Sequence, residues 1–120
     1  MNKEPEELGK RTRRFALAVI RLFAALPRSV VGHVLGRQLL RSGTSVGAQY
    51  REARRAKSNA DFISKMEGAL QELDESGYWL ELMREAAVAR AEVLARLEAE
   101  ADELIAIFVS IVKRSKSPQR

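Results

Sequence analysis

Apolar residues recur at the spacing of one helix face in four stretches of the chain. A helix that packs on a core places its apolar residues three or four positions apart. The last stretch is the clearest, because Leu94, Leu97, Ala101, Leu104 and Phe108 alternate at intervals of three and four. No stretch of useful length alternates apolar and polar residues, so we expect no strands. The pattern predicts helices over residues 6–25, 30–57, 60–85 and 90–114.

Residue types at the predicted limits support this division. Pro27 disfavours helix at the preceding residue, and Ser29 can cap the second helix. Ser58 or Asn59 can cap the third helix. The alanine-rich stretch 84–92 contains no strong helix breaker, so the limit between the third and fourth helices stays open by several residues. Short connections between four amphipathic helices predict a single all-α domain over residues 1–120, an antiparallel up-down-up-down four-helix bundle with a basic tail at residues 115–120.

The second predicted helix carries a stripe of glycines. Each interior glycine costs a helix about 1 kcal/mol relative to alanine. At about 100° per residue, four glycines fall within about 60° of one another, and Tyr50 continues their stripe. Such a stripe lets another backbone approach closely. We expect a contact with a second subunit, and the alternative is close packing on the alanine-rich first helix of the same chain. The stripe consists of Gly32, Gly36, Gly43 and Gly47.

Two aromatic residues of the third predicted helix are further candidates for a contact between subunits. Tyr78 and Trp79 lie beside the core face rather than on it. Aromatic residues in that position anchor subunit contacts or form the hot spot of an interface with another protein. We expect a subunit contact, with the second possibility left open.

Polar residues lie beside the core stripe of the second helix. Polar groups in such a position need hydrogen-bond partners, and carboxylates of the third helix can supply them. We expect a structural network, buried or half-buried, around Arg41. The alternative is an active site with Arg41 as an anion clamp and a carboxylate as base, but no nucleophile with its base, phosphate loop or metal cluster accompanies it. We therefore expect no catalytic residue, no metal, no cofactor and no enzyme activity. The network comprises Arg41, Ser45, Gln49, Glu52, Glu72 and Glu75.

Charge is divided unevenly along the chain. Residues 1–60 carry 13 Lys and Arg against 4 Asp and Glu, whereas residues 61–120 carry 8 against 12. These halves either neutralise each other, within the fold or between subunits, or leave a basic face for an anionic partner. In an up-down bundle, the start of the first helix and the end of the second lie near the same end. The basic residues that would then form one patch for RNA or DNA are Lys10, Arg11, Arg13, Arg14, Arg51, Arg54, Arg55 and Lys57. The alternative is a solvated basic face without a ligand.

The chain contains no cysteine, which suits a reducing compartment. Its first residues are too charged for a signal peptide, and no apolar run approaches the length of a membrane span. We therefore expect a cytoplasmic protein without a membrane partner.

Two segments carry a distinctive combination of motifs. Residues 36–53 read GRQLLRSGTSVGAQYREA, and residues 61–83 read DFISKMEGALQELDESGYWLELM. With them the chain closely resembles, over about residues 14–114, the four-helix-bundle proteins encoded in intervening sequences of bacterial 23S ribosomal RNA genes. One departure is Gln49, where the family often has asparagine; glutamine keeps the amide, so we expect an adjusted hydrogen bond.

The resemblance implies an antiparallel four-helix bundle that assembles into a ring-like homo-oligomer of five copies. The family is also similar in architecture to the accessory variability protein of diversity-generating retroelements, a basic pentameric barrel that binds nucleic acid and a reverse transcriptase. The connection to ribosomal RNA rests on gene location, which is association rather than mechanism. Two functions follow as expectations: nucleic-acid binding through the basic patch, or a protein-interaction scaffold that leaves nucleic acid to its partner.

Overall fold

The computed structural model describes residues 3–117 as four helices joined by short connections. None of the described residues forms a strand. The end of the expected basic tail, residues 118–120, lies outside the described residues. Within residues 3–117, no helix combines the length and apolar character needed to cross a membrane. The helices are α1 (Glu4–Ala24), α2 (Val30–Arg54), α3 (Asn59–Glu85) and α4 (Ala91–Lys116), each within three residues of its predicted limits.

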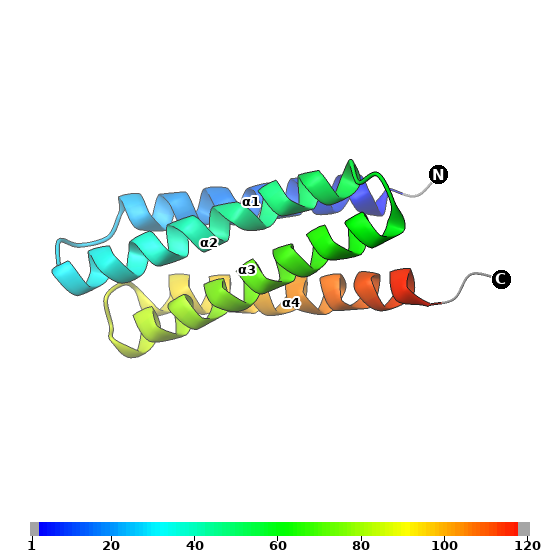
Figure 1. Cartoon of the computed structure of the whole chain (residues 1–120). Helices are drawn as coiled ribbons and strands as arrows, with labels where there is room; N and C mark the ends of the chain where they lie inside the picture. The colour runs from blue at the N-terminus through cyan, green and yellow to red at the C-terminus, as the bar shows by residue number, and fades with distance from the viewer. Residues whose placement is uncertain (1–2, 118–120) are drawn as a thin grey trace.

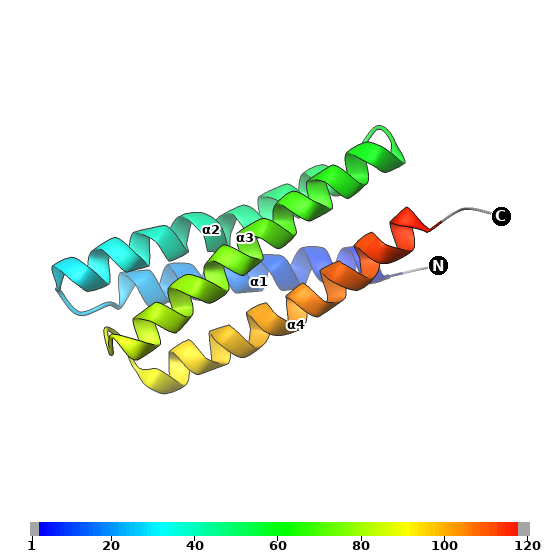
Figure 2. The ribbon, with the colours of Figure 1, turned by 60° about the horizontal axis from the view of Figure 1, so that its bottom comes forward.

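The four helices lie side by side in a bundle that measures 54 by 20 by 20 Å. The α1–α2 and α3–α4 connections lie at one end of it, and the α2–α3 connection lies at the other end together with the start of α1 and the end of α4 (Figures 1 and 2). α2 packs on α1 and α3, whereas α4 packs mainly on α3 and contacts α1 at few positions. This arrangement brings the start of α1 beside the end of α2.

Two serines begin helices as the sequence predicts. The Ser29 hydroxyl accepts a hydrogen bond from the Gly32 amide at 2.9 Å, and the Ser58 hydroxyl accepts one from the Asp61 amide at 3.0 Å. Each bond satisfies an amide that has no partner inside its helix. These caps fix where α2 and α3 start.

The end of α3 has a cap that the sequence does not predict. The Val88 amide donates to the Met83 carbonyl and the Ala87 amide donates to the Arg84 carbonyl, both at 3.1 Å. This pair of bonds is a Schellman motif, which needs a left-handed residue just after the helix. Ala87 takes that role, with φ at 55°. Glycine is the usual residue there, and its absence explains why the sequence left this limit open.

The core runs the length of the bundle and draws on all four helices. It includes one buried polar contact, in which the Ser42 and Ser76 hydroxyl oxygens lie 2.8 Å apart. Apolar spacing along the sequence does not indicate this contact between α2 and α3. The largest buried side chains include Phe15, Val19, Leu39, Val46, Met66, Leu73, Leu80, Leu104 and Phe108.

The glycine stripe of α2 packs within the same chain. A Cβ atom added to Gly43 would lie 3.0 Å from Val19 of α1, and one added to Gly47 would lie 3.3 Å from Thr12 of α1. One added to Gly36 would lie 2.6 Å from Leu26, just after α1, and one added to Gly32 would lie 2.7 Å from Ser29. The close approach is therefore intramolecular, the alternative that the sequence left open. This corrects the expected subunit contact for the buried Gly32, Gly36 and Gly43, because the chain itself covers them.

Candidate functional site

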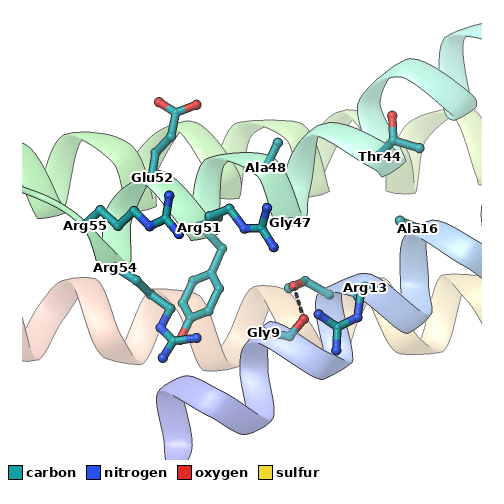
Figure 3. Close-up of a pocket in the computed structure, with 12 residues that line it drawn as sticks. Gly9, Arg13, Ala16, Thr44, Gly47, Ala48, Arg51, Glu52, Arg54 and Arg55 are labelled. Carbon is teal, nitrogen blue, oxygen red and sulfur yellow. Dashed lines mark hydrogen bonds between the residues drawn. The ribbon is translucent and has the colours of Figure 1, made fainter.

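A hollow of about 730 Å³ lies between the first half of α1 and the second half of α2 (Figure 3). Glycine, alanine and threonine residues form much of its lining, so little side-chain bulk fills the space between the helices. Arginines border it from both helices: Arg13 comes from α1, whereas Arg51 and Arg54 come from α2, with Arg55 directly after α2. We call this feature the arginine groove. Its lining comprises Gly9, Thr12, Arg13, Ala16, Thr44, Gly47, Ala48, Tyr50, Arg51, Glu52, Arg54 and Arg55.

Beside the groove, α1 and α2 approach closely at Gly47. The Thr12 side chain contacts this glycine and donates its hydroxyl proton to the Gly9 carbonyl at 3.1 Å. Gly9 in turn leaves room for Arg54, since a Cβ atom at Gly9 would lie 3.3 Å from the Arg54 Nη1 atom. Glycines on both helices therefore bring the arginines together.

The four arginines of the groove have no carboxylate partner among residues 3–117. The one acidic residue of the lining, Glu52, is paired with Lys65 of α3 at 3.0 Å. Figure 3 shows the Glu52 side chain pointing away from Arg13. The groove therefore concentrates positive charge that the fold does not neutralise.

Tyr50 forms the inner wall of the groove but is not available to a ligand. Only 4% of its surface is exposed, and its hydroxyl donates to the Pro5 carbonyl at 2.9 Å. Burial raises the pKa of this hydroxyl above its ordinary value, and the charge of Arg54 opposes the rise. The expectation that Tyr50 lies at a subunit contact is corrected, because α1 and α4 cover it.

Four residues of the predicted basic patch do not line the groove: Lys10, Arg11, Arg14 and Lys57. Arg11 turns to α4, where it pairs with Glu100 at 2.8 Å and Glu103 at 2.9 Å. Hydrogen bonds to Glu100 and then Glu103 raise the pKa of its guanidinium. Lys10 lies 3.8 Å from Glu6. Arg14 borders a different hollow, between α1 and α4, and Lys57 follows α2 without lining the groove.

The expected polar network divides into separate contacts. Arg41 binds Glu72 at 3.3 Å and Glu75 at 3.2 Å, as predicted, but about half of the Arg41 side chain is exposed. The Ser45 hydroxyl donates to the Arg41 carbonyl rather than to a side chain. Gln49 lies against Gly68 of α3, and Glu52 belongs to the Lys65 pair. This arrangement joins α2 to α3 at the surface and leaves no buried charge.

Tyr78 and Trp79 of α3 form an aromatic pair with ring centroids 5.2 Å apart. Tyr78 is 55% exposed. Trp79 is half-buried, and its indole N–H is shielded from solvent without a hydrogen-bond acceptor among the described residues. Trp79 packs against the core, and Tyr78 presents an exposed ring beside it. What Tyr78 contacts in another molecule stays a prediction.

Comparisons with known proteins identify a family and a solved structure that resemble this chain. Residues 6–110 match the family model of the 23S rRNA-intervening sequence protein. Among solved structures, the chain is similar to a protein of unknown function from the S23 ribosomal protein family of Bacteroides thetaiotaomicron, with 35% identity and a TM-score of 0.84 over 91% of this chain and 97% of that one. No curated protein matches the sequence significantly. The matched residues include α2 and α3 and most of α1 and α4, and the chain belongs to the 23S rRNA-intervening sequence protein family.

Proposed function

We propose that this protein binds RNA or DNA without catalysing a reaction, and that the arginine groove contacts backbone phosphates. The observation that carries this proposal is the set of four guanidinium groups that border one hollow without a carboxylate partner among the described residues. Guanidinium groups bind phosphate oxygens through two parallel hydrogen bonds, which makes arginine the favoured residue for this task. A phosphate chain entering the groove meets small side chains rather than bulky ones.

The other groups in the groove favour a contact with little base preference. Sequence is read through base edges or by stacking on exposed aromatic rings. The aromatic ring of the groove, Tyr50, is buried. The hydroxyls of Thr12 and Thr44 donate to main-chain carbonyls at 3.1 and 2.7 Å, so neither is held by a base as a nucleophile would be. Phosphate binding is therefore the chemistry that the groove supports best.

In this proposal the antiparallel bundle is the unit of a ring-like homo-oligomer of five copies, as the family resemblance implies. Large apolar side chains exposed at the start of α2 support a further contact between copies. Val30, Val31 and Val34 are 81%, 56% and 53% exposed. Contiguous exposed apolar surface usually marks an interaction site. A ring would present one arginine groove per copy, which multiplies weak phosphate contacts.

A second candidate is a scaffold that binds another protein through α3. It is favoured by the exposed Tyr78 ring beside Trp79, whose indole N–H has no acceptor among the described residues. Tyrosine and tryptophan are enriched at the centres of protein interfaces.

Fluorescence anisotropy with labelled RNA and duplex DNA tests the first candidate. Two variants carry the same change in charge: Arg51→Gln with Arg55→Gln in the groove, and Arg28→Gln with Arg37→Gln outside it. For duplex DNA each phosphate contact contributes about 0.9 to the steepness of log K against log salt concentration. The groove variant removes two such contacts, so its plot should be shallower by about 2. Its affinity should fall at least tenfold at low salt, and the control variant should retain most of its affinity.

Two results would refute the assignment. The groove has no role if both variants lose affinity equally. The nucleic-acid proposal fails if the wild-type protein binds neither ligand at low salt, and the α3 scaffold then becomes the better candidate.

A further inference from the structure

A second hollow, of about 700 Å³, lies at the opposite end of the bundle from the arginine groove. It is bordered by the end of α1, by the α1–α2 and α3–α4 connections and by the start of α4. Its lining is mainly apolar, with Ala18, Leu22 and Leu26 on one side and Val88 and Val93 on the other. We call it the apolar hollow.

The hollow exists because α1 and α4 contact each other at few positions. Toward the other end, Arg11 joins the two helices through Glu100 and Glu103. Near the connections, Ala18 of α1 and Ala25 just after α1 have small side chains that do not fill the space. The α3–α4 connection closes the end of the hollow, and it is held in place by the left-handed Ala87.

One unpaired cation borders this apolar lining. The two charged residues of the hollow are Arg21 of α1 and Arg90 just before α4. Arg90 is paired with Glu92 at 2.6 Å. Arg21 has no carboxylate partner within residues 3–117. The hollow therefore combines apolar walls with a positive charge that a ligand could neutralise.

We propose that the apolar hollow binds a single-chain amphipathic carboxylate, such as a medium-chain fatty acid. The hydrocarbon chain lies against Leu26, Val88 and Val93, and Arg21 binds the carboxylate. The volume of the hollow is within the range of small-molecule sites, about 300–1,000 Å³. Burial of the chain supplies most of the affinity, and the charged hydrogen bond sets its orientation. This site is separate from the arginine groove and does not depend on nucleic-acid binding.

Titration calorimetry of the full chain with dodecanoate, below its micelle concentration, tests the site. We expect saturable binding of one dodecanoate per chain. Arg21→Gln should weaken dodecanoate binding about tenfold and leave the binding of neutral dodecanol unchanged. The matched control is Arg14→Gln, on the same helix but lining a different hollow, and it should bind both ligands like the wild type.

Variants that fill the hollow give a second test. Ala18→Phe, or Ala89→Leu should the first variant fold poorly, places bulk inside the lining and should abolish binding of both ligands. The Arg51→Gln, Arg55→Gln protein should retain dodecanoate binding, and Arg21→Gln should retain nucleic-acid binding, so the two proposals fail separately.

Three outcomes would overturn the proposal. The first is the absence of saturable dodecanoate binding, and the second is an equal loss in the Arg14→Gln and Arg21→Gln variants. The third is a folded Ala18→Phe protein that binds dodecanoate as tightly as the wild type does, because the ligand would then lie outside the hollow.

Discussion

Tyr50 connects three helices at the end of the bundle that carries the arginine groove. It belongs to α2, its hydroxyl binds the Pro5 carbonyl in the first turn of α1, and its ring centroid lies 5.7 Å from that of Phe108 in α4. α1 and α4 have few direct contacts, so this side chain and the ion pairs of Arg11 with Glu100 and Glu103 both hold the start of α1 in place.

Tyr50→Phe should lower the free energy of unfolding by about 1 kcal/mol, because it removes one buried hydrogen bond and keeps the ring. The raised pKa of Tyr50 adds a pH dependence. Its contribution is complete below the ordinary pKa of 10.0 and is lost as the pH rises toward the raised value, because the unfolded chain releases its proton first. Chemical denaturation at neutral and alkaline pH measures both effects.

Tyr78→Phe is the control for this experiment, because Tyr78 is exposed. The control should resemble the wild type at both pH values. If Tyr50→Phe does the same, its hydroxyl contributes nothing to stability.

Individual side chains of the basic patch could not be assigned from the sequence. Arg11 and Arg13 are two positions apart, which turns them about 200° from each other around α1. Arg13 therefore borders the groove, whereas Arg11 meets the carboxylates of α4. The sequence predicts that basic residues gather at this end of the bundle. It does not give the rotation of α1 about its axis, which depends on packing against α2 and α4.

At the scale of elements, the positions of the helices could be predicted far better than their contacts. Apolar spacing and the caps at Ser29 and Ser58 place all four helices within three residues. The glycine stripe correctly indicated a close approach but not the partner, because a smooth helix face fits another copy and the same chain equally well. Its partner, α1, is set by the short α1–α2 connection and the fit of Val19 against Gly43.

Two glycine substitutions should have opposite effects on stability. Gly43→Leu inserts a side chain where even a Cβ atom would lie 3.0 Å from the buried Val19, so it should lower the free energy of unfolding by about 2 kcal/mol. A Cβ atom at Gly77 would have no neighbour within 4 Å, so Gly77→Ala should raise the free energy of unfolding by about 1 kcal/mol. Urea denaturation measures both. A stable Gly43→Leu protein would contradict the packing of α2 on α1.

Ala87→Gly should stabilise the protein by about 1 kcal/mol. Ala87 has a φ of 55°, which favours glycine over residues with a Cβ atom. Thermal unfolding of this variant checks the expectation, with Ala86→Gly as the control. Ala86 keeps right-handed backbone at the end of α3, so glycine gains nothing there. An equal shift in both variants would contradict the role of the Schellman motif.

At the scale of the whole molecule, part of the basic half is neutralised within the fold and part is not. Arg11 and Arg41 of the basic half pair with carboxylates of the acidic half and so join helices to each other. The arginines of the groove remain without such partners in the described part of the chain. The sequence predicts the surplus and the end of the bundle at which it gathers, and the fold shows which arginines remain unpaired there.

Assembly is tested by the aromatic pair on α3. If Tyr78 anchors a contact between copies, Tyr78→Asp should lower the mass measured by light scattering, because it places a charge in an apolar contact. Ala106→Asp adds the same charge at an exposed position of α4 and should leave the mass unchanged. A wild-type protein that is a well-folded monomer at high concentration would refute the proposed oligomer.

The start of α1 and the end of α4 share one end of the bundle with the arginine groove (Figure 1). An acidic tag joined near the start of α1 is therefore attached at the same end of the bundle as the groove, where it can compete for the guanidinium groups. A reporter attached by chemical coupling at the α1–α2 connection is the safer choice for measurements on nucleic acid. The same reporter would obstruct studies of fatty-acid uptake, so each question needs its own labelling position.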